Sequence, residues 1–399
     1  TLSPSSAASD VYKRQHVYLC NKPARSAHVS QNLSKIKLKN SCRNFFLYFF
    51  VYFVNYLFTI LVKRFFYFPF NNNQEEKMKI KVGQRLMMMV MFLIIIGVQS
   101  VAQEGKKFKI GISQFAEHPA LDDVRKGFED ELKSLGVNAD IIYKNSQGDT
   151  GVAGVIAQKF VSDKADLIFG IATVSAQAAK QSTDKIPVLF SAVTDPVNSQ
   201  LVKTMDKVGG NVTGTTDATP MEKQLGLFQK IDPKIKKVGI IYNTSESNSE
   251  IQVANAKEIG AKLGLEIRAV GVNNINDIPQ AVNSMISKVD GFYTITDNIV
   301  ASAINLISMA ANERGMVTVG AEEAHVKGGI LLTDGLSYYE LGRQTGRMAK
   351  EILADGKKPE DMPVETLANT TKVVNVKTMN NLKLNKELPV FEGAEFIEQ

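Results

Sequence analysis

The stretch Pro187-Val-Leu-Phe-Ser-Ala-Val-Thr-Asp-Pro-Val197 places hydroxyl and carboxyl side chains directly after a short apolar run. The apolar run 188–190 predicts a buried strand in a sheet that is covered on both faces. Thr194 and Asp195 follow it, and Pro196 restricts the backbone there. In an open α/β sheet, ligands bind outside the carboxyl ends of the strands. This stretch therefore predicts a strand end that binds a ligand.

A second stretch, Asp166-Leu-Ile-Phe-Gly-Ile-Ala-Thr173, follows the same plan. Its apolar strand leads to a hydroxyl at the start of a helix, where free amide N–H groups favour an anion. Ala172, Thr173 and Thr194, with Ser191 in support, are therefore candidates to bind the carboxylate of a small zwitterion. The alternative is that these hydroxyls only cap helices.

The 399-residue chain has a formal net charge of +6, but the basic excess lies in its first quarter. Residues 1–102 hold 14 Lys and Arg against 3 Asp and Glu, which leaves 33 basic and 38 acidic residues in 103–399, a net charge of −5. We therefore expect no nucleic-acid partner. Cys20 and Cys42 also precede residue 103, so the remainder can form neither a disulfide nor a thiolate metal site.

The first 102 residues are interpreted as a prefix and a targeting segment. Residues 45–62 are apolar enough to span a membrane, but their Phe, Leu, Tyr, Ile and Asn content is also typical of translated AT-rich non-coding DNA. We expect 1–77 to be a non-native or untranslated-region prefix, with translation starting at Met78. Residues 78–102 predict a secretory signal peptide with a basic start and small residues before Gln103. The body is then exported and periplasmic; the alternative is an uncleaved membrane anchor.

The remainder alternates strands with amphipathic helices in two similar runs, which is typical of βαβ units and parallel sheets. The predicted strands are 109–112, 139–143, 167–171, 188–190 and 211–215, then 237–242, 265–270, 291–296 and 317–320, with later ones at 331–332 and 372–376. The predicted helices are 121–135, 150–161, 175–182 and 220–231, then 249–263, 278–288, 299–314 and 339–353. The pattern predicts an α/β fold with two Rossmann-like lobes and parallel sheets, joined by a hinge of several strands. Lobe 1 is expected at 103–219 plus about 331–353, and lobe 2 at 220–330 plus about 354–390.

Polar residues also follow the strands of the second run. Asn243 and Glu246 come after its first strand, and Asp297 and Asn298 after its third. Carboxylate and amide oxygens there could accept hydrogen bonds from the ammonium group of a zwitterion held by the first lobe. The alternative is that they are solvated turn formers.

Phe115, in the loop after the first strand, is the candidate to contact the ligand's side chain, since the chain contains no Trp. His118 in the same loop is weighed as well, but a lone loop His is more readily explained as an ordinary hydrogen-bonding residue. Glu322 and Glu323, which follow the predicted strand 317–320, are also considered as ligand contacts, but they are not chosen as candidates.

Six motifs occur in an order that resembles the tryptophan/tyrosine-type solute-binding proteins of ABC transporters, over essentially all of 106–390. They are Ile112-Ser-Gln-Phe-Ala-Glu-His-Pro-Ala-Leu-Asp122, Ala192-Val-Thr-Asp-Pro-Val197, Gly209-Gly-Asn-Val-Thr-Gly214, Tyr242-Asn-Thr-Ser-Glu-Ser-Asn-Ser249, Thr296-Asp-Asn298 and Tyr338-Tyr-Glu-Leu-Gly342. The resemblance implies a type I periplasmic-binding-protein fold with three crossover strands. It also implies an amino acid or related ligand in the cleft, aromatic ones included, and no catalytic residues. The run Gly320-Ala-Glu-Glu-Ala324 departs from the pattern, in which a smaller polar run is expected, and leaves the ligand's identity open.

The resulting prediction is an exported solute-binding protein, a monomer without metal or cofactor, which closes about its hinge and presents both lobes to an ABC permease. A transcription regulator of similar fold needs a DNA-binding module where this chain has its hydrophobic segment. An α/β enzyme is disfavoured because no Gly-x-Ser-x-Gly elbow, phosphate loop or metal spacing occurs. An exported receptor that serves a sensor protein remains open.

Overall fold

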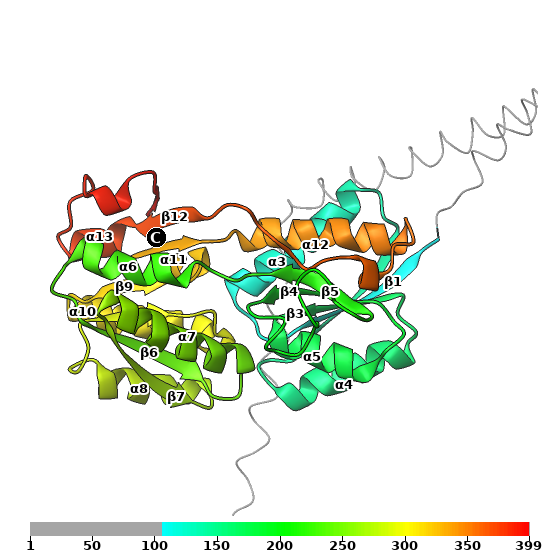
Figure 1. The fold of residues 1–399 in the computed structure, drawn as a ribbon, viewed down its shortest axis with the longest axis horizontal. Coiled ribbons are helices and arrows are strands. Elements are labelled where there is room, and N and C mark those ends of the chain that lie inside the picture. Colours follow the sequence, from blue (N-terminus) through cyan, green and yellow to red (C-terminus); the bar gives the residue numbers. More distant parts are fainter. Residues whose placement is uncertain (1–105, 399) are drawn as a thin grey trace, which may run out of the picture. The chain divides into compact units, whose positions relative to one another are not determined.

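The structure is a computed structural model that describes residues 106–398 (Figure 1). The predicted prefix at 1–77 and signal peptide at 78–102 lie outside the described residues. Within 106–398, no helix combines the length and the apolar character that a membrane span requires.

The first sheet has six strands, in the order β11-β5-β4-β3-β1-β2, and every neighbouring pair is parallel. The strands are β1 (Phe108–Gln114), β2 (Ala139–Asn145), β3 (Leu167–Ile171), β4 (Val188–Val193), β5 (Val212–Thr216) and β11 (Glu365–Thr366). Its helices are α3 (Pro119–Ser134), α12 (Tyr338–Leu353), α4 (Thr150–Ser162) and α5 (Thr173–Ser182). Figure 1 shows α3 and α12 on one face and α4 and α5 on the other. We call this sheet and its helices lobe 1.

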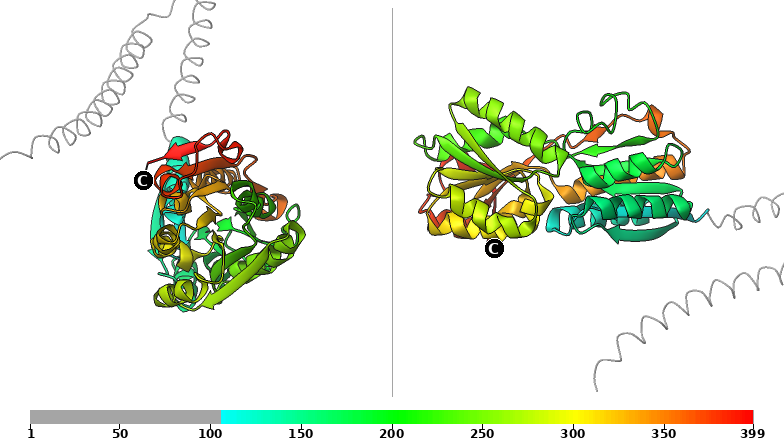
Figure 2. Two further views of the ribbon diagram at one scale, coloured as in Figure 1. Left: turned by 90° about the vertical axis from the view of Figure 1, so that its left-hand side faces the viewer. Right: turned by 90° about the horizontal axis from the view of Figure 1, so that it is seen from below.

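The second sheet has seven strands, in the order β13-β12-β10-β9-β8-β6-β7, and only the β10–β12 pair among them is antiparallel. The strands are β6 (Lys237–Asn243), β7 (Glu266–Val272), β8 (Gly291–Thr294), β9 (Val317–Gly320), β10 (Leu332–Gly335), β12 (Thr371–Asn375) and β13 (Glu395–Ile397). Its helices are α6 (Met221–Ile231), α7 (Ser247–Leu263), α8 (Ile278–Met285), α9 (Asn298–Ser302), α10 (Ile304–Glu313), α11 (Glu323–Lys327) and α13 (Val376–Asn381), with short 3₁₀ turns at Ile275–Asp277 and Pro389–Phe391. A third 3₁₀ turn, Pro359–Asp361, contacts β5 of lobe 1. We call this sheet and its helices lobe 2; helices cover both faces of its sheet (Figure 2).

The two lobes repeat one strand order. In lobe 1, the first strand, β1, lies between the second strand, β2, at the sheet edge and the third strand, β3. In lobe 2, β6 lies in the same way between β7 at the sheet edge and β8. Strand direction is the same throughout each run, because helices carry the chain back over the faces of the sheet. The order 2-1-3-4-5 has its switch point between the first and third strands, where α/β sheets bind ligands.

The chain passes between the lobes three times. The connections are 217–220 from β5 to α6, 336–337 from β10 to α12, and 367–370 from β11 to β12. We call them crossovers one, two and three. The predicted fold class, two α/β lobes with mostly parallel sheets and a multi-strand hinge, is confirmed.

The structure corrects the predicted lobe boundaries in the last third of the chain. β10 pairs with β9 and belongs to lobe 2, although 331–353 was expected in lobe 1; within that range, α12 packs on α3 of lobe 1. β11 lies beside β5 in lobe 1, although 354–390 was expected in lobe 2. Both strands are short, so their apolar patterns say little about their partners. The predicted helix 299–314 is also two helices, because the backbone of Ala303 departs from helical geometry.

Candidate functional site

A small cavity of about 10 Å³ lies between the lobes and takes side chains from both. The lining residues are His118, Leu121, Ala192, Thr194, Asp217, Asn248, Thr296, Asp297, Asn298, Ala301, Glu322 and Tyr338. Most of them follow the carboxyl end of a strand, where parallel sheets place their ligand-binding residues. Among the described residues, no lysine or arginine lines this cavity.

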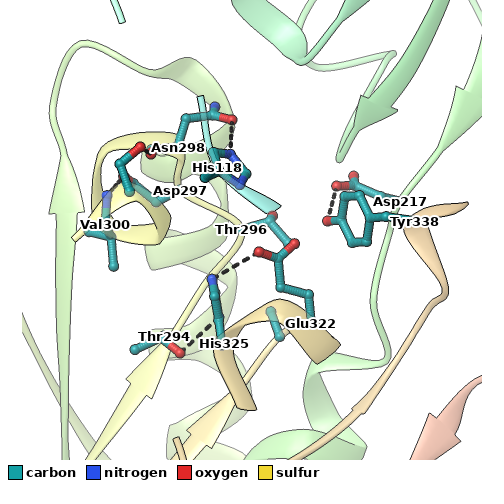
Figure 3. A network of polar contacts seen from close by, with 12 residues as sticks. His118, Asp217, Thr294, Thr296, Asp297, Asn298, Val300, Glu322, His325 and Tyr338 are labelled. Atoms are coloured by element: carbon teal, nitrogen blue, oxygen red, sulfur yellow. Dashed lines mark hydrogen bonds and ion pairs between the residues drawn. The ribbon is translucent and has the colours of Figure 1, made fainter. Parts of the chain in front are cut away.

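Hydrogen bonds join the lobes at the cavity wall. The Thr194 and Thr296 hydroxyls lie 2.9 Å apart. His118 Nε2 is 3.2 Å from Asn298 Oδ1 (Figure 3). Thr194 follows β4 and His118 precedes α3 in lobe 1, whereas Thr296 and Asn298 follow β8 in lobe 2. Burial lowers the pKa of His118, so the neutral imidazole is favoured at this contact.

At the hinge, Asp217 of crossover one accepts a hydrogen bond from the Tyr338 hydroxyl, with 2.6 Å between the oxygens (Figure 3). Tyr338 begins α12 directly after crossover two. Burial raises the pKa of Asp217 to about 6, and the charge of Glu322 adds to this shift. Its second oxygen, Oδ1, has no hydrogen-bond partner among the described residues.

Glu322 lines the same end of the cavity and is held by a histidine behind it. His325 Nε2 lies 3.0 Å from Glu322 Oε1, and His325 Nδ1 is 3.0 Å from the Thr294 hydroxyl (Figure 3). Burial alone would raise the pKa of Glu322, but the charge and hydrogen bond of His325 hold it below its usual value. Glu322 therefore keeps its negative charge inside the cavity.

Two buried carboxyl groups organise the lobe 2 wall. Asp297 caps α9 by accepting from the Val300 N–H at 2.9 Å and also accepts from the Asn243 N–H at 2.6 Å. Glu246 accepts from the side chains of Asn243 at 3.2 Å and of Asn298. Burial and the nearby Asp297 raise the pKa of Glu246 to about 8, and burial raises that of Asp297. Glu246 is therefore harder to ionise than an exposed carboxyl, and its oxygens position the amides at the cavity wall.

Unsatisfied polar atoms point to the chemistry that the cavity suits. Three lining atoms lack a hydrogen-bond partner within 106–398: His118 Nδ1, Asp217 Oδ1 and Asn248 Oδ1. An unpaired buried polar atom costs about 1–3 kcal/mol, which a complementary ligand would recover. Carboxylate and amide oxygens only accept, so with the charged Glu322 they suit a cationic group with several N–H donors.

The neighbouring ends of β3 and β4 have unusual backbone geometry. Ala172 and Ala192, which directly follow the paired residues Ile171 and Ser191, have φ values of 77° and 55°. Strained backbone of this kind clusters at functional sites. Ala172 also provides no side-chain cap for α5, whose first residue, Thr173, is buried. The amide N–H groups of an uncapped first turn favour an anion.

The predicted site residues fall into four groups. Thr194, Asp297 and Asn298 line the cavity. Asn243 and Glu246 lie behind Asp297 and Asn298, and Ala172 and Thr173 lie at the start of α5. Ser191 and Phe115 are placed elsewhere: the Ser191 hydroxyl bonds to Thr215 at 2.8 Å, and Phe115 packs in the core of lobe 1.

Sequence reasoning missed Asp217, Tyr338, Asn248 and Thr296. The rule that ligands bind beyond strand ends would have found Asp217 had it been applied to β5, the strand predicted at 211–215. Only 331–332 was predicted as the strand before Tyr338, whereas β10 runs to Gly335, so the place of Tyr338 just beyond a strand end was not recognised. His118 and Glu322 were considered but not chosen as candidate site residues, and both line the cavity.

Comparisons with known proteins agree with this architecture. The family model described as "ABC transporter substrate binding protein" matches residues 109–392. The tyrosine-binding protein of Clostridioides difficile (strain R20291) is 42% identical over 285 residues, which are 70% of this chain and 82% of that protein.

Solved structures give the same result. A conserved domain protein from Vibrio cholerae is 35% identical with a TM-score of 0.71, over 73% of this chain and 100% of that chain. An ABC domain in complex with L-Trp from Streptococcus pneumonia is 34% identical with a TM-score of 0.69, over 72% and 100%. The ligand-free, open structure of a substrate binding protein with adhesive properties from Clostridium difficile is 42% identical with a TM-score of 0.58, over 73% and 99%. The two-lobed fold is therefore that of a type I periplasmic binding protein, and the chain belongs to the family of ABC transporter substrate binding proteins.

Proposed function

We propose that this protein binds an aromatic α-amino acid in the cavity between its lobes and delivers it to an ABC permease outside the cytoplasm. The observation that carries the proposal is a buried, acceptor-rich cavity without a cationic side chain among the described residues. Relatives named for binding tyrosine and solved with L-Trp support the aromatic class. The predicted signal peptide at 78–102 supports export, and the function includes no catalytic step.

The ammonium group would occupy the hinge end of the cavity. Asp217 Oδ1 and Asn248 Oδ1 are free to accept its hydrogen bonds, and the charge of Glu322 favours a cation there. Asp297 and Asn298 would complete the lobe 2 wall, with Asn243 and Glu246 holding them in place. Hydrogen bonds to charged groups contribute about 1.5–3 kcal/mol each, so this end would supply much of the affinity.

The carboxylate would bind at the adjoining strand ends of lobe 1. Ala172 and Thr173 offer the uncapped start of α5, and Thr194 offers a hydroxyl at the cavity wall. A helix N-terminus stabilises an anion through its free N–H groups and its dipole. This arrangement binds a carboxylate without a lysine or arginine.

The lobe arrangement supports a ligand held between lobes that open and close. The cavity of about 10 Å³ has room for roughly one water molecule, so an amino acid enters only when the lobes move apart. The TM-score is higher with the L-Trp complex, 0.69, than with the open structure, 0.58, although the open protein is the more similar in sequence. The lobes are thus arranged more like the liganded relative.

Isothermal titration with L-tyrosine, L-tryptophan, L-phenylalanine and L-leucine tests the proposal. We expect micromolar or tighter binding of an aromatic amino acid, of order −8 kcal/mol. Asp217→Asn should weaken it by about tenfold or more, because a charged hydrogen bond is lost. Asp195→Asn is the matched control, since within 106–398 the Asp195 side chain accepts hydrogen bonds from Asn198 of its own turn. Absence of heat with every natural amino acid would contradict the proposal.

A further inference from the structure

Asp334 is a buried carboxylate whose bonds meet at the hinge rather than at the cavity. It is 2% exposed and is the third residue of the four-residue strand β10. Its Oδ2 lies 2.7 Å from Lys223 Nζ, and its Oδ1 accepts a hydrogen bond from the Thr370 hydroxyl. Its main-chain carbonyl accepts from Gln224 Nε2 at 2.8 Å.

These partners belong to different crossovers. Lys223 and Gln224 lie in the first turn of α6, directly after crossover one (217–220). Asp334 itself comes one residue before the end of β10, after which crossover two (336–337) begins. Thr370 is the last residue of crossover three (367–370). One carboxylate therefore joins all three connections on the lobe 2 side of the hinge.

The same cluster is packed against the loop that carries Glu322 into the cavity. Gln224 Nε2 also donates to the Ala321 carbonyl at 3.1 Å. At Gly335, a Cβ atom would lie 2.7 Å from the Ala321 oxygen and 3.2 Å from the Glu322 Cα, so the strand end and this loop have no space between them. A shift of the crossovers would therefore displace Glu322.

We propose that Asp334 is a positioning residue that holds the three crossovers at fixed spacing, so that the lobes move about one axis into the ligand-binding arrangement. The inference rests on the proposed function and concerns how closure is achieved. Hinges consist of a few residues at element ends that absorb the backbone rotation. When the crossovers are not tied together, the lobes reach more relative orientations, and the competent closed state is a smaller fraction of them. The apparent Kd rises as that fraction falls.

Distances between spin labels in the two lobes test the proposal directly. Val155 in α4 and Met309 in α10 are 67% and 61% exposed, so cysteine at each accepts a label in the full chain after Cys20→Ser and Cys42→Ser. The variant Asp334→Asn keeps the side-chain volume and removes the charge that pairs with Lys223. Lys223→Met and Thr370→Val each remove one partner and leave Asp334 in place.

The matched control is Glu131→Gln. Glu131 is also buried and ion-paired, to Arg343 at 2.8 Å and Arg347 at 3.3 Å, but it joins α3 to α12 inside lobe 1. It should lower thermal stability without changing the distance between the lobes. This separates a hinge effect from a general loss of stability.

We expect Asp334→Asn and Thr370→Val to broaden the distance distribution of the ligand-free protein. The Kd for L-tyrosine or L-tryptophan should rise by roughly threefold to tenfold, mainly through faster dissociation. Unchanged distance distributions in Asp334→Asn overturn the proposal. If Asp334→Asn does not fold, unchanged distributions in Lys223→Met and Thr370→Val overturn it instead. An equal broadening in Glu131→Gln also overturns it. If the wild type binds neither amino acid, the proposed function fails, but the ligand-free distances still decide the role of Asp334.

Discussion

Asp217 has one oxygen bound to Tyr338 and the other free in the cavity, and burial raises its pKa to about 6. An ammonium ion requires the ionised carboxylate. Above pH 6 the carboxylate is charged and ready to bind, whereas below pH 6 the ligand must displace a proton. The affinity for a ligand with an ammonium group is therefore greatest above pH 6 and is lost as the pH falls through that value.

We expect the Kd for an aromatic amino acid to rise by about tenfold per pH unit below 6 and to level off above 7. Titration calorimetry between pH 5 and pH 8 measures this. In Asp217→Asn the weakened binding should lose this dependence, because the side chain no longer titrates. The groups that face Asp217 are Tyr338, Glu322 and Thr194, and the titratable residues His118 and Asp297 line the same cavity.

His118 provides the control for this experiment, since it is the cavity residue that becomes positively charged in acid. Burial lowers its pKa, so its protonation begins at a lower pH than that of an exposed histidine, and the added positive charge would also repel an ammonium ion. In His118→Asn the tenfold-per-unit slope should remain if Asp217 is its source. A flat profile in His118→Asn would assign the pH dependence to the histidine instead.

At this scale the sequence predicts strand-end residues but not the direction of their side chains. Thr194, Asp297 and Asn298 reach the cavity as expected. Ser191 lies in β4 itself, and its hydroxyl bonds to Thr215. Successive strand side chains point to opposite faces of the sheet, and the β4–β5 register shift between Phe190 and Val193 changes the alternation there. No sequence pattern announces such a shift.

Among the elements, α3 and α12 approach each other through two glycines. A Cβ at Gly127 would lie 2.1 Å from the Tyr339 carbonyl oxygen, and one at Gly342 would lie 2.0 Å from that of Val124. The obstructing atoms are backbone, so relief requires the helices to move apart. This contact seats α12, and with it Tyr338, on lobe 1.

We expect Gly342→Ala to lower the free energy of unfolding by about 1–3 kcal/mol, because overpacking outweighs the gain in helix propensity. Denaturant unfolding followed by circular dichroism measures the loss. Gly226→Ala in α6 is the matched control: its Cβ would meet no atom within 4 Å. That variant should be neutral or slightly more stable. Equal stability of the two variants would show that the helix contact yields without cost.

Helices and strands were predicted correctly where their apolar residues form a run long enough to show a helical or strand periodicity. The buried strands β3 and β4 and the amphipathic helix α12 were recognised. The two-residue strand β11 and the three-residue β13 were not, because they exist only through pairing with β5 and β12. Such strands are set by tertiary contacts, and this also explains the wrong lobe boundaries near 331 and 354.

For the whole molecule, the closed arrangement depends on a small set of polar contacts between lobes. Beyond the Thr194–Thr296 and His118–Asn298 bonds, Gln177 Nε2 donates to the Ser247 hydroxyl at 3.4 Å, and the Ser302 hydroxyl donates to the Glu117 carbonyl at 3.4 Å. A typical hydrogen bond contributes only about 0.5–1.5 kcal/mol net. Water can replace each of these contacts, so closure without ligand is weakly favoured.

A ligand that touches both lobes shifts this balance by its differential affinity for the closed state. We therefore expect hydrogen exchange to slow on addition of L-tyrosine or L-tryptophan in segments 192–196 and 294–299, which face each other across the cavity. Exchange in 127–131 of α3, packed inside lobe 1, is the internal reference and should stay unchanged. Mass spectrometry of peptides from the two conditions measures both. Equal slowing in all three segments would mean that the ligand stabilises the fold as a whole, and slowing confined to 192–196 would mean that it binds lobe 1 without drawing lobe 2 onto it.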